Sequence, residues 1–154
     1  MPPERQPETG AAAHYRALES LYRSAPINGL FSSDIELREG FARVRFEIDE
    51  AAFHAAGAAH GTIYFKMMDD AAFYACNSLV TDRFLLTTAF NLNFMRPLKS
   101  GPVIAEGQWA SGRRRVFVAD ARLIDGEGEV AARGTGTFMR SRIPLSSLPG
   151  YRTG

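Results

Sequence analysis

Two adjacent carboxylates, Asp69 and Asp70, lie in the middle of an otherwise apolar stretch of the chain. A carboxylate that is buried without a partner is strongly unfavourable, so each of the two needs a compensating group or a function. Lys66 precedes them by three and four residues, and on a helix it could pair with either one. A structural ion pair and a catalytic carboxylate explain this spacing about equally well. Because Asp70 is the better-placed partner for Lys66, Asp69 is the candidate for catalysis.

A second chemical group is the backbone at His60-Gly61-Thr62, where the apolar stretch begins. A glycine at a helix N-terminus leaves free N–H groups, and the helix dipole adds roughly half a positive charge there. Such an end could polarise a carbonyl group. Gly61 and Asp69 are separated by a helical rise of about 12 Å, which is too far for both to act on one carbonyl. If both serve one reaction, two antiparallel helices from two chains must meet across a twofold axis, which predicts at least a homodimer.

The elements that would position these groups follow from the hydrophobic pattern. The stretch from Gly61 to about Val80 is apolar on every side, which is typical of a buried helix. Alternating apolar residues predict strands, and the last four strands are expected to form a meander. The expected class is α+β, an antiparallel sheet of five to six strands wrapped around one long central helix. The predicted order is a helix at 12–24, a hairpin at 35–48, the central helix at 61–80, and strands at 86–94, 103–110, 115–124 and 130–139.

Composition narrows the class of protein. With 154 residues and a net charge of +1, the chain fits one domain, and no global field would attract nucleic acid. The lone cysteine, Cys76, cannot form an intramolecular disulfide, and no Cys or His cluster has metal-ligand spacing. No apolar run has the length of a membrane span. We therefore expect a cytoplasmic protein without metal or membrane contact, with a flexible N-terminus at 1–11 and a single domain at 12–154.

Several motifs resemble those of one family. Residues 60–78, with His60-Gly61-Thr62 and Asp69, resemble the HGG-x(6)-D-x-A helix of the PaaI-like (phenylacetate-pathway type) hotdog thioesterases. The similarity runs in order from about residue 30 to residue 140. Its other parts are Asn91 to Pro97, which resembles the N-x-x-F-x-R-P strand end, Gly101 at the start of the next strand, Gly112-Arg113-Arg114 at the G-R/K hairpin, and Ala132 to Phe138, which resembles the A-x-G-T-x-T-F final strand.

This resemblance implies a hotdog fold and hydrolysis of acyl-CoA or aryl-acyl-CoA thioesters by a homo-oligomer, either a dimer or a tetramer. Coenzyme A would be part of the substrate, and no cofactor is implied. Asp69 matches the catalytic carboxylate of the family, as general base or nucleophile, and Gly61 matches the backbone N–H that polarises the carbonyl. His60 matches the motif histidine that shapes the helix start. Thr87 falls where a hydroxyl often assists the water or the carboxylate.

Two positions depart from the family pattern. Thr62 replaces the second glycine of the motif, and His54 stands six residues before the motif histidine, where the family often has Asn or Gln. Both positions are candidate substrate contacts. The departures leave room for a non-catalytic acyl-CoA-binding hotdog protein. An enoyl-CoA hydratase of similar fold is a further alternative, although the Asp and His spacing typical of those enzymes is not found.

The remaining candidates are substrate contacts. Phe65 and Phe73 could line an acyl pocket or could simply pack in the core. Coenzyme A carries phosphates, and the densest basic run, Arg113-Arg114-Arg115, falls at a predicted hairpin. Arg96 and Lys99 flank another turn. We expect these cations to contact the phosphates, with a solvated turn as the equally good alternative for any one of them.

Overall fold

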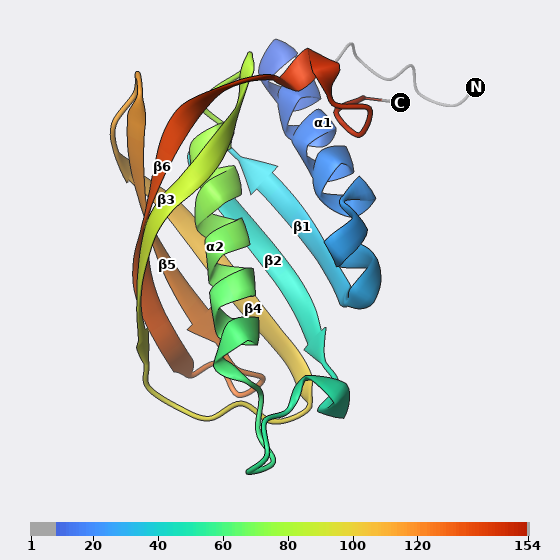
Figure 1. The fold of residues 1–154 in the computed structure, drawn as a ribbon, viewed down its shortest axis with the longest axis vertical. Coiled ribbons are helices and arrows are strands. Elements are labelled where there is room, and N and C mark those ends of the chain that lie inside the picture. Colours follow the sequence, from blue (N-terminus) through green and yellow to red (C-terminus); the bar gives the residue numbers. More distant parts are fainter. Residues whose placement is uncertain (1–8, 154) are drawn as a thin grey trace, which may run out of the picture.

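One curved antiparallel sheet wraps around a long helix, α2, in the computed structural model, which describes residues 9–153 (Figure 1). Within these residues the sheet has six strands in the order β1-β2-β4-β5-β6-β3. The predicted α+β class and the predicted strand segments are therefore confirmed. The elements are α1 (Gly10–Ser24), η1 (Pro26–Leu30), β1 (Ser32–Arg38), β2 (Phe41–Ile48), η2 (Glu50–Ala52), α2 (Gly61–Asn77), β3 (Arg83–Phe94), β4 (Gly101–Ser111), β5 (Val116–Ile124), β6 (Val130–Pro144) and η3 (Leu145–Ser147).

The central helix α2 is buried as its sequence predicts. Eleven of its 17 residues are buried, and the helix ends at Asn77, three residues before the predicted end. Gly107 on β4 lets the helix lie against the sheet, because a Cβ atom there would come within 2.2 Å of the Ala71 carbonyl oxygen. None of the helices in residues 9–153 is long and apolar enough to cross a membrane.

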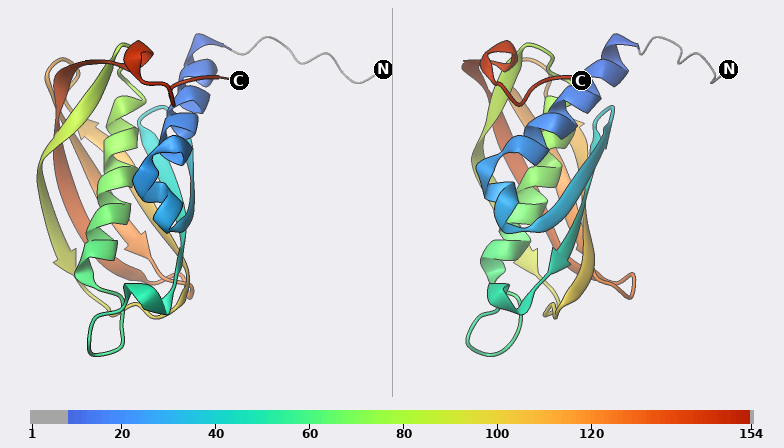
Figure 2. Two further views of the ribbon diagram at one scale, coloured as in Figure 1. Left: turned by 45° about the vertical axis from the view of Figure 1, so that its right-hand side comes forward. Right: turned by 90° about the vertical axis from the view of Figure 1, so that its right-hand side faces the viewer.

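The first helix, α1, packs beside α2 and against β1, on the same side of the sheet (Figure 2). Its buried side chains include Leu18 and Tyr22, which follow the predicted helical spacing. The Thr9 hydroxyl caps the helix by accepting a hydrogen bond from the Ala12 N–H. The helix begins at Gly10, inside the segment predicted to be flexible, and residues 1–8 of that segment lie outside the described residues.

The prediction that the last four strands form a meander is wrong for β3. This strand pairs with β6, while β4 pairs with β2 in a register that sets Ala105 opposite Val44. Apolar alternation predicts that a strand exists, but it does not say which strand is its neighbour. The segment that joins β3 to β4 crosses the end of the sheet, where the Leu98 carbonyl accepts a hydrogen bond of 2.8 Å from the Ala59 N–H. As a result β3 lies at a free edge of the sheet, beside α2.

Candidate active site

Asp69 lies on the side of α2 that faces β3. The Thr87 hydroxyl of β3 donates a hydrogen bond of 2.8 Å to its Oδ1 atom. Burial raises the pKa of Asp69 from 3.8 to about 6, the nearby Asp70 carboxylate adds to this rise, and the Thr87 hydrogen bond and the Lys66 charge oppose it. A carboxylate with a pKa near 6 can accept a proton close to neutral pH. The structure thus brings together two of the residues that the sequence singled out, Asp69 and Thr87.

A β-bulge in β3 aims Thr87 at the helix. Simple alternation along the strand places Leu86 and Phe90 on one face and Thr87 on the other. The pairing with β6 shifts between Thr87 and Ala89, which reverses the alternation. Leu85 is therefore buried, Leu86 is 47% exposed, and Thr87 faces α2. Leu86 and Phe90 therefore lie on opposite faces, and the simple alternation of the sequence is wrong at this strand.

Asp70 has a different partner on another side of α2. The Lys66 ammonium lies 2.5 Å from its Oδ2 atom and donates a second hydrogen bond, also of 2.5 Å, to Oδ1 of Asn28. Burial raises the pKa of Asp70, and Lys66 opposes the rise. The predicted Lys66–Asp70 pair is confirmed, and Asp69 is the carboxylate of the two without a bonded cation.

The start of α2 has a histidine as its N-cap. The Nδ1 atom of His60 accepts a hydrogen bond of 3.1 Å from the Thr62 N–H and lies 2.9 Å from the Thr62 hydroxyl. Gly61 is the first residue of the helix, and its N–H makes no hydrogen bond to any described residue. The predicted role of His60 in shaping the helix start agrees with this geometry. Thr62, the departure from the glycine motif, takes part in the same cap.

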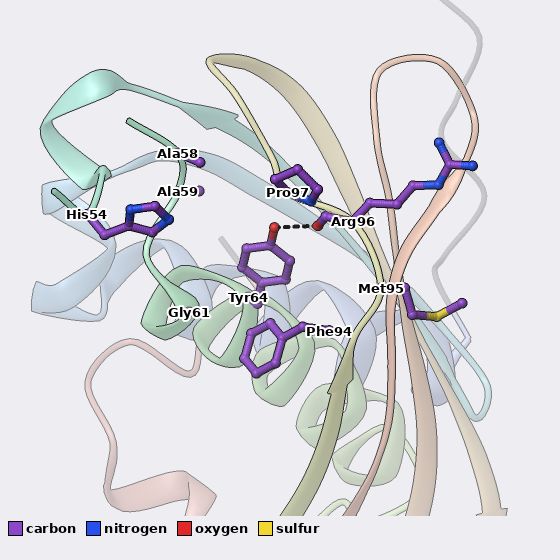
Figure 3. A pocket seen from close by; sticks show the side chains of 9 residues that line it. All are labelled: His54, Ala58, Ala59, Gly61, Tyr64, Phe94, Met95, Arg96 and Pro97. Carbon is purple, nitrogen blue, oxygen red and sulfur yellow. Dashed lines mark hydrogen bonds between the residues drawn. The ribbon is translucent and has the colours of Figure 1, made fainter. Parts of the chain in front are cut away.

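Gly61 borders a cleft of about 400 Å³ (Figure 3). Tyr64 of α2 forms part of its wall and donates a hydrogen bond of 2.7 Å to the Arg96 carbonyl. Asp69 is not among the lining residues, as expected from the length of helix between it and Gly61. The cleft is lined by His54, Ala58, Ala59, Gly61, Tyr64, Phe94, Met95, Arg96 and Pro97.

The other predicted contacts lie in three places. His54 borders the Gly61 cleft, whereas the Arg96 side chain extends away from it (Figure 3) and pairs with Glu129 at 3.8 Å. The side chains of His60 and Thr62 border a separate cavity of about 560 Å³ between α2, β2 and η1. The structure therefore does not join all predicted contacts into one pocket.

The two predicted acyl-contact phenylalanines differ in burial. Phe65 is partly exposed and packs edge-to-face on Phe90 of β3, with ring centroids 5.6 Å apart. Phe73 is buried and packs against Phe84 and Phe138. Phe65 thus lies at the surface one turn before Asp69, and Phe73 belongs to the core.

The basic hairpin between β4 and β5 lies at the opposite end of the sheet from the start of α2, where the Gly61 cleft is (Figure 1). Arg113, Arg114 and Arg115 are exposed between β4 and β5, and the Arg113 guanidinium stacks 4.3 Å from the centroid of the Trp109 ring. Lys99 lies near the cleft end, where it donates a hydrogen bond to the Gly57 carbonyl. Within one protomer the two groups of predicted phosphate contacts are therefore far apart.

The two aromatic residues that line the Gly61 cleft, Tyr64 and Phe94, were not assigned to the site by sequence reasoning. Their rings meet edge-to-face with centroids 5.0 Å apart. Tyr64 is buried, so its pattern resembles that of an ordinary core residue. Phe94 lies within the motif from Asn91 to Pro97, but its alternation with Phe90 and Leu92 is also the ordinary pattern of a strand. Their position became evident only from the pairing of β3 with β6.

Comparisons with known proteins agree with this fold. Residues 56–132 match the family model described as Thioesterase superfamily. The Saccharolobus solfataricus protein "Putative esterase SSO1253" is 30% identical over 104 residues, which are 68% of this chain and 69% of that protein. The E. coli PaaI protein of the phenylacetic acid degradation operon superposes with a TM-score of 0.77 at 23% identity, covering 86% of this chain and 98% of that one.

A second similar structure was solved with a ligand. The smu.793 protein of Streptococcus mutans UA159, bound to acetyl CoA, has a TM-score of 0.66 and 20% identity, over 71% of this chain and 89% of that one. The two structural likenesses concern the fold, and together with the family match they confirm the expected hotdog fold and the resemblance to PaaI-like proteins.

Proposed function

The chain belongs to the Thioesterase superfamily, and on that premise we propose that it hydrolyses acyl-CoA thioesters, with Asp69 as general base or nucleophile. The observation that carries the proposal is the contrast between two neighbouring carboxylates. Asp70 is bonded to Lys66, whereas within residues 9–153 Asp69 is bonded only to the Thr87 hydroxyl, and burial raises its pKa to about 6. Asp69 is therefore available to accept a proton near neutral pH.

The proposed site is shared between two chains. β3 is an edge strand of 12 residues, and such edges favour pairing with another strand. Thr87, beside Asp69, lies in the first half of β3, and Phe94, beside Gly61, is its last residue. Antiparallel pairing of two β3 strands about a twofold axis would set the Asp69 end of one chain against the Gly61 end of the other. A homodimer supplies both groups to one thioester in this way.

The reaction follows from these positions. Asp69 removes a proton from a water molecule, whose oxygen attacks the thioester carbonyl carbon. The negative charge that develops on the carbonyl oxygen is held by the Gly61 N–H of the other chain, at the positive end of α2. The tetrahedral intermediate collapses, the carbon–sulfur bond breaks, and coenzyme A leaves as a thiolate that needs no strong acid. If Asp69 attacks directly, an acyl anhydride forms first and water then hydrolyses it.

The proposed substrate is an acyl ester of coenzyme A, with coenzyme A as part of the substrate and without a resident cofactor. The acetyl CoA bound to the similar S. mutans protein supports this choice. Antiparallel dimerisation would also bring the arginine hairpin of one chain toward the Arg96 and Lys99 end of the other. We assign the phosphate contacts to this combined basic surface.

Thiol release from a panel of acyl-CoA esters tests the role of Asp69. The variant Asp69→Ala is expected to lower kcat by about 10³-fold, since it removes the proposed proton acceptor. Asp120→Ala is the matched control, because Asp120 is an exposed carboxylate on β5 that accepts a hydrogen bond from Thr135. Turnover by Asp69→Ala at the wild-type rate would remove Asp69 from the mechanism.

Mixed dimers test the shared site. Gly61→Pro deletes the proposed N–H donor, and proline is well tolerated at the first helical position. The preceding residue, His60, already has φ −64° and ψ 145°, which suits a following proline. A mixture of Asp69→Ala and Gly61→Pro chains should recover about a quarter of wild-type activity, because half of the dimers contain one intact site. Absence of recovery after verified subunit exchange would contradict a site built from two chains.

Non-catalytic acyl-CoA binding is the alternative that one observation favours. Thr62 replaces the second glycine of the motif and bonds into the helix cap, so the helix start differs from the family pattern. Tight binding of acyl-CoA esters without thiol release by the wild-type protein would favour this reading. Loss of enoyl absorbance with crotonyl-CoA would instead indicate a hydratase.

A further inference from the structure

The ring of Phe94 lies directly over Gly61. A Cβ atom built on Gly61 would come within 3.2 Å of Cζ and 3.3 Å of Cε1 of this ring. The backbone of Gly61 does not require glycine, since it is not among the described glycines with positive φ. The close contact at Gly61 is therefore with the Phe94 ring. The absence of a side chain at residue 61 lets this ring approach the helix start.

The surroundings of Phe94 hold the ring in this place. Its edge-to-face partner Tyr64 is fixed by the hydrogen bond from its hydroxyl to the Arg96 carbonyl (Figure 3). The N–H groups of Met95 and Arg96 both donate to the Ala131 carbonyl, at 2.8 and 3.1 Å, and this anchors the strand end to β6. The aromatic contact and the backbone bonds together fix the position of the ring.

Phe94 is nevertheless 57% exposed, because it stands at the wall of the Gly61 cleft rather than in the core. Its neighbours in the cleft wall are mostly apolar, namely Ala58, Ala59, Tyr64 and Pro97. A thioester whose carbonyl oxygen accepts from the Gly61 N–H must place its other substituents beside this ring. The acyl group, which is the apolar one, fits the apolar side of the cleft.

We propose that Phe94 determines acyl-group specificity, by limiting the size of the acyl group that can lie beside the Gly61 N–H. The proposal rests on the proposed thioesterase function and assigns a residue to the acyl side of its site. Gly61 then has two functions in the site. Its N–H polarises the thioester carbonyl, and the absence of a side chain leaves room for the Phe94 ring.

Acyl-CoA esters of increasing chain length and branching test the proposal with wild type, Phe94→Leu and Phe94→Ala. Smaller side chains should move the optimum of kcat/KM to larger acyl groups. Each additional accommodated methylene group should add a factor of about four, which corresponds to about 0.8 kcal/mol. Val116→Ala is the control, since Val116 is an exposed apolar residue at the far end of β5 and should leave the profile unchanged. An unaltered chain-length profile in both Phe94 variants would overturn the proposal.

A double-mutant cycle tests the contact between the ring and Gly61. Gly61→Ala keeps the N–H but pushes the ring aside, so kcat/KM should fall about tenfold in the wild-type background. In the Phe94→Ala background the same change should cost less than about twofold, because no ring is displaced. Equal losses in both backgrounds would mean that the ring contact has no part in specificity.

Binding measurements separate this proposal from the hydrolytic mechanism. Thioether analogues of the acyl-CoA panel cannot be hydrolysed, and calorimetry gives their dissociation constants for each variant. If the wild type binds the analogues but hydrolyses no ester, the proposed hydrolysis fails, and the shift in binding preference on Phe94→Ala still decides the specificity proposal. If the wild type binds no member of the panel, both proposals are overturned.

Discussion

Two adjacent aspartates on different faces of α2 have different bonding partners. On one face of α2, Asp70 is bonded to Lys66, which also bonds Asn28 and lies 5.4 Å from the Tyr22 ring centroid. On the face toward β3, Asp69 has one hydrogen-bond partner among the residues that the structure describes, the neutral Thr87 hydroxyl. The two side chains are chemically identical and adjacent in sequence, so their different roles come from the elements that pack against each face.

This difference shows how one buried helix can hold both a structural and a reactive carboxylate. The Asp70 face is closed by α1, which supplies the Tyr22 ring, by η1, which supplies the Asn28 amide, and by Phe31, which follows η1. The Asp69 face lies against an edge strand, where a hydroxyl group donates the hydrogen bond to the carboxylate and Lys66 contributes only its more distant charge. A negative charge with little compensation is costly in the folded protein, and functional sites often carry such a cost.

The largest expected effect comes from removing the cation on the Asp70 face. Lys66→Met should lower the free energy of unfolding by about 3 kcal/mol at pH 7, because it leaves the largely buried Asp70 carboxylate without a charged partner. Urea unfolding monitored by circular dichroism measures the change. The double variant Lys66→Met/Asp70→Leu should recover most of the loss, since it removes the orphaned charge. A loss below about 0.5 kcal/mol in the single variant would mean that the pair acts like a surface ion pair.

The features that lie within α2 itself could be predicted from the sequence. The spacing of Lys66 and Asp70 is a local property of any helix, and an apolar stretch that surrounds them predicts a buried helix. The position of Gly61 at the helix start follows from the same local reasoning. These features depend on residues within four positions of one another, where the geometry of the backbone leaves few choices.

The contacts that β3 makes with α2 could be predicted only in part. The bulge that turns Thr87 toward Asp69 arises in the pairing of β3 with β6, between residues about fifty positions apart. Thr87 was found through resemblance to a family, while alternation alone placed it on the wrong face. The position of Phe94 over Gly61 depends on the same long-range pairing. Non-local contacts of this kind leave no periodic signal in the sequence.

A smaller effect is expected from the hydroxyl on the Asp69 face. Thr87→Val removes a hydrogen bond that lowers the pKa of Asp69, so this pKa should rise above about 6. The acidic limb of the pH profile of kcat/KM should then move upward by about one pH unit, the value of one such charge-assisted bond. Thr88→Val is the matched control, because the Thr88 hydroxyl donates to the Thr137 carbonyl instead. If the acidic limb moves equally in both variants, or in neither, the Thr87 hydroxyl does not control the pKa of Asp69.

The smallest expected effect measures what the reactive carboxylate costs the fold. Because folding raises the pKa of Asp69 from 3.8 to about 6, the folded protein binds this proton more tightly than the unfolded chain does. The stability gained from that proton is complete below about pH 4 and is lost as the pH rises through about 6. Asp69→Asn carries no titrating group at this position and has no such loss. When the pH is raised from 4.5 to 7.5, the free energy of unfolding of the variant should therefore increase by about 1 kcal/mol relative to that of the wild type, after allowance for partial solvent screening. Urea unfolding at the two pH values measures this difference, with the exposed Asp120→Asn as control. A difference of the opposite sign would mean that folding lowers the pKa of Asp69 below 3.8 instead of raising it.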